Sequence, residues 1–247
     1  MHDDSLFIFQ KGFNYSQDGP GNRLVYHLSG CNMHCPWCAN PEGLSQCDSS
    51  TKITVDELVA EAVSSKLIFI DAGGVTFTGG EASLQKEAVL KAINRLKAEG
   101  ISTCIETNAS LPNCEDLLDA ADYVIADYKT PSNNRLKEIY HGEISTIEEN
   151  LLFRAKTGKP LLVRIPLVHY FNCSEDDTKG FLEFFTRLRK EALGELNFEI
   201  LPYHEFGKEK YIKAGMEYTV TDGFVTDNDI KKLASAITNA DLTLINT

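Results

Sequence analysis

Three cysteines within eight residues constrain this chain more than any other feature. Cys31, Cys35 and Cys38 have the spacing C-x3-C-x2-C, and no fourth cysteine stands close enough to complete a four-thiolate site. A [4Fe–4S] cluster normally takes four cysteine ligands, so three thiolates leave one iron open to a small molecule, much as a catalytic zinc keeps one position open. The spacing therefore predicts a cluster whose open iron binds a chelating cofactor.

A structural zinc knuckle is the competing interpretation of the same cysteines. Such a site requires a fourth Cys or His at a fixed spacing. His34 is the candidate, but it lies inside the loop between Cys31 and Cys35. We therefore favour iron and sulfur.

The composition indicates a globular α/β protein. A chain of 247 residues with 43% hydrophobic content can bury a substantial core. No repeat, low-complexity tract or linker rich in Pro, Gly or Ser divides it, so we expect one domain over residues 1–247. The net charge of −12 offers no basic stripe for phosphates and argues against nucleic-acid binding.

The chain carries no sequence signal for secretion or membrane insertion. Its first five residues lack the positive charge and apolar run of a signal peptide, and no stretch is long and apolar enough to span a bilayer. Seven cysteines, an odd number, do not fit a secreted disulfide framework. We expect a cytoplasmic protein without membrane contact, in which Cys47, Cys104, Cys114 and Cys173 are buried, inert thiols.

Short β-rich runs alternate with helical segments, which is the pattern of βαβ units around a parallel sheet. Strands are predicted at 24–28, 75–77, 101–106, 123–127, 161–167 and 198–201. Capping boxes, Thr54 with Glu57 and Thr146 with Glu149, predict helices that begin near residues 55 and 147. Gly100 and Gly158 stand where helices should end.

Polar residues follow several of these strands. In barrels built from such units the chemistry gathers at the carboxyl ends of the strands. The residues found there are Gly79, Gly80 and Glu81; Glu106, Thr107 and Asn108; Asp127, Tyr128 and Lys129; and His204. Within the strand at 161–167, Arg164 alternates with apolar neighbours and would point to the barrel interior, where it needs an anionic partner.

With these positions in view, the chain resembles the radical S-adenosylmethionine superfamily and, within it, the glycyl-radical-enzyme activating enzymes, over nearly its whole length. The blocks that carry the resemblance are Asp18-Gly19-Pro20-Gly21, the cysteine loop, residues 74–82, Thr107-Asn108, Asp127-Tyr128-Lys129, Arg164 and residues 201–208. The resemblance implies an α/β fold of the partial (β/α)6 TIM-like barrel type. Cys47 is the one cysteine between Cys38 and Gly79, so no ferredoxin-like insert is expected there.

The resemblance also implies the chemistry. S-adenosylmethionine would chelate the open iron through its amino and carboxylate groups, and an injected electron would cleave it to a 5′-deoxyadenosyl radical. Gly79 and Gly80 would let the backbone approach the methionine end, and Glu81 would face its ammonium. The alternative is a plain Gly-Gly turn with a surface Glu.

The remaining cofactor contacts are implied in the same way. Trp37 would cover the cluster and adenine, although burial alone also explains a tryptophan. Arg164 would meet the cofactor carboxylate or form a structural salt bridge with Asp127 or Glu106, and His204 would lie near the ribose or be an ordinary packed histidine. The complete implied set of cofactor-binding residues is Trp37, Ala39, Gly79, Gly80, Glu81, Thr107, Asn108, Asp127, Tyr128, Lys129, Arg164 and His204.

A monovalent-cation site formed by Glu106, Thr107 and Asp127 is implied as well. The family has Asp where this chain has Glu106, so the sequence leaves that site open.

The partner implied by the resemblance is a glycyl radical enzyme, either pyruvate formate-lyase or a related lyase or decarboxylase. Asn40-Pro41-Glu42 resembles the activators of decarboxylases and dehydratases, so the sequence does not select one. The Asp18–Gly21 turn would lie near the site and contact the partner's glycine loop, or be an ordinary tight turn. A flavodoxin or ferredoxin would supply the electron, and we expect a monomer.

Two other functions compete with this one. A radical enzyme with a small-molecule substrate would keep the cluster and cofactor, but the segment at 203–207 argues against it. An electron-transfer module that never cleaves the cofactor would leave Gly79–Glu81 and Asp127–Lys129 unexplained.

Overall fold

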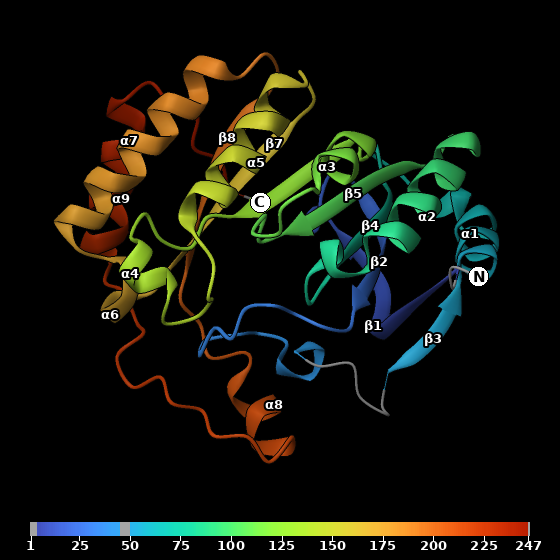
Figure 1. Ribbon diagram of the computed structural model, residues 1–247, viewed down its shortest axis with the longest axis horizontal. Coiled ribbons are helices and arrows are strands. Elements are labelled where there is room, and N and C mark those ends of the chain that lie inside the picture. The colour runs from blue at the N-terminus through green and yellow to red at the C-terminus, as the bar shows by residue number, and fades with distance from the viewer. Residues whose placement is uncertain (1–3, 45–49, 247) are drawn as a thin grey trace. The chain divides into compact units, whose positions relative to one another are not determined.

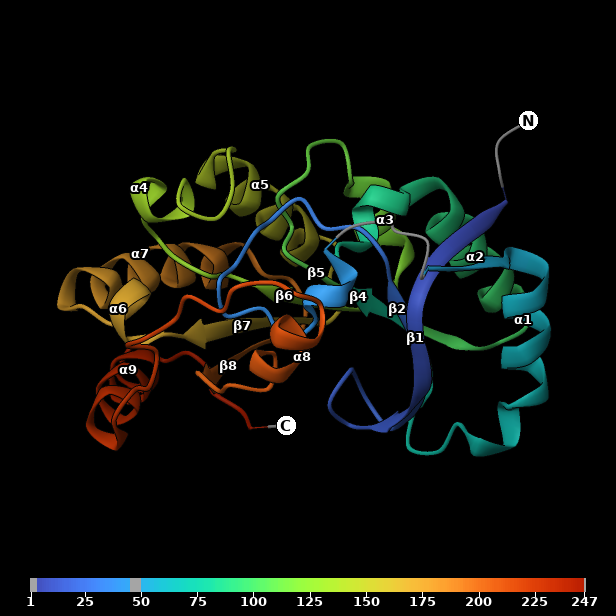
Figure 2. The same ribbon diagram turned by 90° about the horizontal axis from the view of Figure 1, so that it is seen from below.

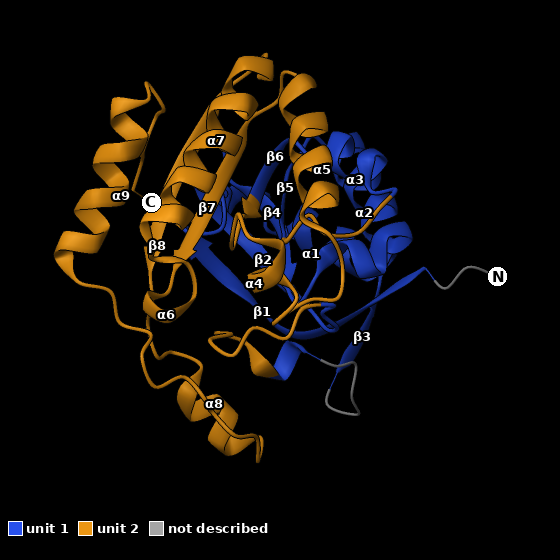
Figure 3. Ribbon diagram, turned by 60° about the vertical axis from the view of Figure 1, so that its left-hand side comes forward, with its two compact units in different colours: residues 1–32, 42–107, 113–125 blue, residues 33–41, 108–112, 126–247 orange. Residues whose placement is uncertain are grey.

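The computed structural model describes residues 4–44 and 50–246, so Cys47 lies outside the described residues. The chain divides into two compact units (Figure 3). Unit 1 comprises residues 1–32, 42–107 and 113–125, and unit 2 comprises residues 33–41, 108–112 and 126–247. The cysteine loop passes from unit 1 to unit 2 after Asn32.

Strands and helices alternate along the chain (Figure 1). The strands are β1 (Ser5–Tyr15), β2 (Asn22–Leu28), β3 (Thr51–Thr54), β4 (Gly74–Gly79), β5 (Ser102–Thr107), β6 (Tyr123–Asp127), β7 (Leu161–Leu167) and β8 (Leu196–Pro202). The helices are α1 (Val55–Ser64), α2 (Lys86–Ala98), α3 (Glu115–Ala120), α4 (Asn133–Leu136), α5 (Ile144–Lys156), α6 (His169–Asn172), α7 (Glu175–Glu191), α8 (Lys208–Lys213) and α9 (Asp227–Asn239), with short 3-10 turns η1 (Pro41–Gly43), η2 (Lys66–Ile68) and η3 (Ala82–Gln85). The strand order is β3-β1-β2-β4-β5-β6-β7-β8.

Unit 1 contains a parallel core with antiparallel additions. Strand β2 runs parallel to β4, with Leu28 opposite Gly79, and β4 runs parallel to β5. Strand β1 pairs antiparallel with both β2 and β3. Helix α2 buries one face, including Ile93 and Leu96, and ends before Gly100, whose φ of +70° suits a glycine.

Unit 2 is built on the parallel pair β7 and β8, which lie side by side in Figure 2. The aromatic face of α7 packs beneath them: the Phe185 ring lies 4.5 Å from Phe198 of β8. Helix α9 begins at the capping box of Thr226 and Asp229 and buries Leu233 and Ile237. These apolar faces form the core that supports the ends of the strands.

The predicted α/β class and partial (β/α)6 arrangement are confirmed, since each of β2 and β4–β8 precedes helical segments. The strands predicted at 123–127 and 161–167 match β6 and β7 residue for residue. The predicted start near residue 147 is wrong, because α5 begins at Ile144, whose N–H donates to the Asn133 side chain (2.9 Å). That bond satisfies an N-terminal amide and moves the start one turn earlier.

The scattered cysteines divide into two groups. Cys104 and Cys114 are buried, as predicted. Cys173 is only partly buried, at the junction of α6 and α7, so the prediction for it is wrong. Among residues 4–44 and 50–246, no helix has the length and apolarity needed to cross a membrane.

Candidate cluster and cofactor site

The first half of the cysteine loop is fixed in unit 1. The Gly30 N–H donates to the Gly43 carbonyl (2.8 Å), and the Cys31 N–H donates to the Leu44 carbonyl (3.2 Å). Because Cys31 follows the end of β2 by three residues, these bonds orient the chain as it leaves the sheet. Cys31 therefore stands at the carboxyl end of a parallel strand, where the sequence predicts the chemistry.

The Gly-Gly-Glu tripeptide is bonded directly to this part of the loop. The Gly80 N–H donates to the Leu28 carbonyl, and the Glu81 N–H donates to the Gly30 carbonyl, both at 2.8 Å. A Cβ on Gly80 would lie 2.7 Å from the Gly30 carbonyl carbon and closer still to its oxygen. The structure thus explains Gly80 by its close approach to the chain's own cysteine loop.

The carboxylate of Glu81 is completely buried, so the alternative of a surface Glu is wrong. Its Oε1 accepts bonds from the Ser83 N–H (3.0 Å), the Ser83 hydroxyl (2.6 Å) and the Thr107 hydroxyl (2.6 Å). These bonds cap η3 and link the ends of β4 and β5. Burial, with the charge of Glu81 nearby, raises the pKa of the Cys114 thiol to about 12.

The polar residues that end β5 already hold protein partners. Glu106 accepts a bond from the Thr78 hydroxyl (2.5 Å), and Thr107 donates to Glu81. In unit 2, the Asn108 side-chain oxygen accepts bonds from the Ser110 N–H (3.0 Å) and hydroxyl (2.7 Å). These bonds set the direction of each side chain before any ligand binds.

The second half of the cysteine loop lies in unit 2. The Cys38 N–H donates to the Cys35 carbonyl (3.1 Å), which makes a tight turn, and the Asn40 N–H donates to Cys38 Sγ (3.4 Å). Hydrogen bonds to sulfur favour the thiolate, which is the form that binds iron. The donor chemistry of this loop therefore fits an iron–sulfur cluster.

Trp37 is buried in unit 2 against α6. Its ring centroid lies 4.6 Å from that of Phe171 and 6.4 Å from that of Tyr170. These contacts agree with the packing interpretation, and a role in covering the cluster and adenine stays a prediction.

Three residues hold this half of the loop: Gly207, which belongs to the motif at residues 201–208, and Lys210 and Tyr211, which the sequence interpretation missed. The Tyr211 hydroxyl donates to the Cys35 carbonyl (3.1 Å), and the Lys210 ammonium donates to Asn40 Oδ1 (2.8 Å). A Cβ on Gly207 would lie 3.1 Å from the Cys38 carbonyl carbon and 3.3 Å from Ala39 Cα. The available signal for Lys210 and Tyr211 was their place directly after that motif.

The residues that follow β6 point in two directions. Lys129 forms an ion pair with Asp127 (2.6 Å). The Tyr128 side chain instead packs against Phe184 of α7 (4.7 Å between ring centroids), and its hydroxyl donates to Glu148 (2.9 Å). The structure therefore does not bring the Tyr128 side chain together with its two predicted companions.

Arg164 does form a salt bridge with a carboxylate, Glu199, which the sequence interpretation did not name, and its predicted pairing with Asp127 or Glu106 stays a prediction. Its Nε donates to Glu199 at 2.7 Å, and both side chains are buried. The two residues stand opposite each other in the register of β7 and β8, which explains the pairing. A paired arginine of this kind is a fixed anion-binding group.

His204 is half-buried after β8. Its ring stacks on Phe206 at 4.0 Å between centroids, and Nδ1 accepts the Phe206 N–H at 3.3 Å. Burial lowers the pKa of His204 below its ordinary value, which favours the neutral imidazole.

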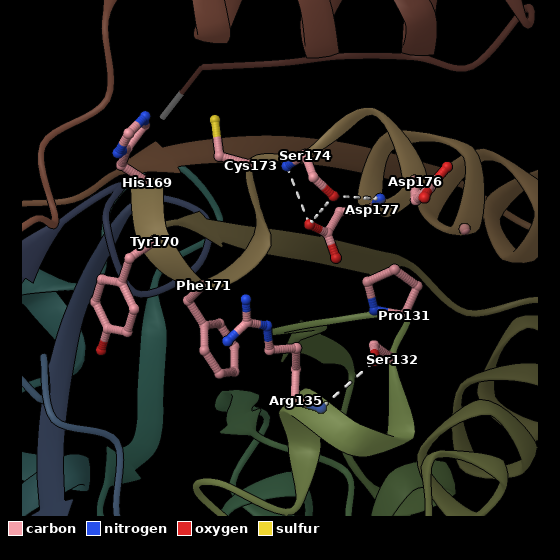
Figure 4. A pocket seen from close by; sticks show the side chains of 11 residues that line it. Pro131, Ser132, Arg135, His169, Tyr170, Phe171, Cys173, Ser174, Asp176 and Asp177 are labelled. Atoms are coloured by element: carbon pink, nitrogen blue, oxygen red, sulfur yellow. Dashed lines mark hydrogen bonds between the residues drawn. The ribbon is translucent and has the colours of Figure 1, made fainter.

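A pocket of about 320 Å³ opens in unit 2 among α4, α6 and α7 (Figure 4). Phe171, which packs on Trp37, lines it together with Arg135 and Cys173. Beside it, the Asn172 side chain donates to the Lys129 carbonyl (2.7 Å) and the Pro166 carbonyl (2.8 Å). Asn172 thereby ties together the segments that follow β6 and β7.

The Asp18–Gly21 turn is not beside the cysteine loop of unit 1. It precedes β2, whereas Cys31 follows it, and seven strand residues separate the two ends, a distance of about 20 Å. The buried Arg23 donates to the Pro20 carbonyl (3.1 Å) and the Thr76 hydroxyl (2.7 Å) and so holds the turn at the amino end of the sheet. The turn therefore lies at the opposite end of β2 from Cys31, and its contact with the partner's glycine loop stays a prediction.

The three predicted cluster ligands belong to different units, Cys31 to unit 1 and Cys35 and Cys38 to unit 2. Within the described part of the chain, no group of three His, Cys, Asp or Glu side chains is already drawn together as a metal site. The ligand set stays a prediction.

Comparison with known proteins decides the family. Residues 25–184 match the family model described as the radical SAM superfamily. The chain belongs to the radical SAM superfamily. It is also 32% identical over 232 residues, covering 90% of both chains, to the pyruvate formate-lyase-activating enzyme of Staphylococcus aureus. Membership implies a [4Fe–4S] cluster and S-adenosylmethionine, and the chain is a radical SAM enzyme of the activating type.

Two solved structures share the fold. A domain of a pyruvate-formate lyase-activating enzyme from Bacteroides vulgatus superposes with a TM-score of 0.55 at 21% identity, covering 70% of this chain and 98% of that one. Streptococcus suis SuiB, bound to its precursor peptide SuiA, gives a TM-score of 0.66 at 13% identity, covering 89% of this chain and 47% of that one.

Proposed function

We propose that this radical SAM enzyme activates a glycyl radical enzyme by removing one α-hydrogen from a glycine of its partner. The observation that carries the proposal is the 32% identity to a pyruvate formate-lyase-activating enzyme, sustained over 90% of both chains. Pyruvate formate-lyase, or a related lyase or decarboxylase, is the partner class. We further propose a cytoplasmic monomer of one domain that takes its electron from a flavodoxin or ferredoxin.

The cluster would be held by Cys31, Cys35 and Cys38. Together with S-adenosylmethionine, it would supply the radical chemistry that removes the hydrogen atom. The chain's own residues orient the reactants and exclude water. Glu81 and Thr107 hold the ends of β4 and β5 in place through their mutual hydrogen bond. Backbone groups in this fixed loop would contact the methionine end of the cofactor.

Other residues act through charge and hydrogen bonding. Arg164, oriented by Glu199, would bind the cofactor carboxylate. Because Nδ1 of the neutral His204 ring accepts the Phe206 N–H, its Nε2–H would donate to a ribose hydroxyl. We also propose a monovalent cation at Glu106, Thr107 and Asp127. It would have to compete with Thr78 for the Glu106 carboxylate and with Lys129 for the Asp127 carboxylate.

The test combines two measurements on anaerobically reconstituted protein. The reduced protein should release 5′-deoxyadenosine from S-adenosylmethionine. A glycyl radical should appear by electron paramagnetic resonance when the right glycyl radical enzyme is added, and deuterium should pass from its labelled glycine into 5′-deoxyadenosine. A partner variant with alanine at the radical glycine is the control. Absence of a radical with every glycyl radical enzyme tried, together with turnover of a small molecule, would contradict the proposal.

A further inference from the structure

The loop between Cys35 and Asn40 has no helix or strand of its own. Its backbone must therefore be held by other parts of the chain, or else be ordered by the ligand. In unit 2 the support comes from α8, which reaches the cysteine loop in both Figure 1 and Figure 2. The two segments are far apart in sequence, since Cys35 and Tyr211 are separated by 176 residues.

Tyr211 makes the most buried of these contacts. Its side chain is 5% exposed, and its hydroxyl donates to the Cys35 carbonyl at 3.1 Å. The ring packs edge-on against Tyr218 at 5.2 Å between centroids, which fixes its direction.

Gly207 and Lys210 hold the other end of the same loop. Gly207 has ordinary helical angles, with φ −76° and ψ −24°, so its backbone does not require glycine. What requires it is space, because a Cβ there would run into the Cys38 carbonyl. The ammonium of Lys210, the residue directly before Tyr211, donates to the Asn40 side chain. Each of the three residues contacts a different position of the loop.

We propose that Gly207, Lys210 and Tyr211 form a clamp that holds the Cys35–Asn40 loop in the conformation that binds the cluster, with Tyr211 as its main positioning residue. The proposal rests on the proposed function only in assuming that these cysteines bind a cluster. A preformed loop loses less conformational freedom when it takes up iron and sulfur. The clamp therefore slows loss of the cluster without itself touching iron.

The first test is Tyr211→Phe, which keeps the ring and removes one hydroxyl. The matched control is Tyr218→Phe, because the Tyr218 hydroxyl bonds to Tyr203 (2.7 Å), away from the cysteine loop. Both proteins are reconstituted with iron and sulfide, and release of iron to a chelator is followed by absorbance. Loss of a buried hydrogen-bond donor should accelerate release about fivefold in Tyr211→Phe and leave Tyr218→Phe within about twofold of the original protein.

The melting temperature of the proteins without a cluster separates positioning from plain stability. Equal melting temperatures with faster iron release in Tyr211→Phe alone support the clamp. Equal iron release in both variants, or release that simply follows the melting temperature, overturns it. If the original protein takes up no iron and sulfide at all, the cluster assignment and the proposed function fail instead.

The second test is Gly207→Ala, which acts through space alone. Its control is Gly12→Ala, because a Cβ on Gly12 would meet no atom within 4 Å. Gly207→Ala should bind less than half of the iron that the original protein binds, with an unchanged far-ultraviolet circular dichroism spectrum. Full iron content and unchanged release in Gly207→Ala would overturn the clamp.

Discussion

Replacing Gly80 by alanine separates two explanations of the Gly-Gly-Glu tripeptide. If the glycine serves only to admit the cofactor, Gly80→Ala should fold normally and lose cofactor binding. If it serves the chain's own packing, the protein without cluster or cofactor should already be destabilised. The structure predicts the second result, because a Cβ on Gly80 would lie 2.7 Å from the Gly30 carbonyl carbon and 2.9 Å from the Gly43 oxygen.

The size of the effect follows from the same distances. Ordinary contact begins near 3.4 Å, so the Gly30 carbonyl carbon alone would have to move by 0.7 Å, and the carbonyl oxygen, which lies closer, by more. Such overpacking costs about 1–3 kcal/mol, and strain on the bond from the Glu81 N–H to the Gly30 carbonyl adds about 1 kcal/mol. We expect the free energy of unfolding to fall by about 3 kcal/mol, or the melting temperature by roughly 6–12 °C for a chain of this size.

The assay is urea unfolding of the protein without a cluster, with Gly12→Ala as the control. Gly12 lies in the same unit and has open space around its Cα, so its variant should change the free energy of unfolding by less than about 1 kcal/mol. Equal stability of Gly80→Ala and the original protein, with S-adenosylmethionine binding lost, would refute the packing explanation.

Three further outcomes are expected. Cys35→Ala should lose the cluster, because one iron loses its thiolate ligand. Iron analysis and an assay of 5′-deoxyadenosine release check this, and full activity of the variant would contradict the ligand assignment. Glu199→Gln should lower the free energy of unfolding by about 3 kcal/mol, since it removes the buried negative charge that faces Arg164. The control, Glu191→Gln at the exposed pair with Lys156, should lower it by less than about 1 kcal/mol. Equal changes of the two variants in denaturant titrations would contradict a larger contribution from the buried pair. Burial lowers the pKa of His204 in the folded state, so the unfolded chain binds more protons than the folded protein as the pH falls. The contribution of His204 to the free energy of unfolding is therefore present above about pH 6.5 and is lost as the pH falls below that value. Nuclear magnetic resonance titration should place the pKa of His204 below its ordinary value. Phe206→Ala uncovers the imidazole ring and should raise that pKa. The same His204 pKa in both proteins would argue against burial as the cause.

The sequence predicted the features that depend on local order. Strands β6 and β7 are continuous runs rich in apolar and β-branched residues, and their bounds were predicted correctly. Strand β1 was missed because Gln10, Lys11 and Gly12 interrupt its apolar pattern, close to the irregular register between Ile8 and Gln10. The start of α5 was misplaced because a side chain from α4, not the local capping box, satisfies its first amide.

Side-chain partners were harder to predict, because they depend on the register between strands and on long-range packing. Arg164 was expected to have an anionic partner, and it has one in Glu199, which the sequence interpretation did not name. A signal was present, since Glu199 alternates with buried Phe198 and lies opposite Arg164 once β7 and β8 are aligned. The signal for Tyr211 is weaker, because its place after the motif at residues 201–208 does not identify its partner, which lies 176 residues earlier in the chain.

Several residues of the family motifs are used first to hold the chain itself. Gly80 fits against the Gly30 carbonyl, Glu81 accepts bonds from Ser83 and Thr107, and Gly207 fits against the Cys38 carbonyl. Each of these contacts fixes a backbone segment that either bears a cysteine or follows a strand of the parallel sheet. A loop without regular structure has many conformations, and ordering it when the ligand binds would weaken binding. Residues of such motifs can therefore be required for cluster and cofactor binding even where their side chains contact neither ligand. Substitutions at Gly80 and Gly207 should show this, because they alter the backbone of the cysteine loop before either ligand is added.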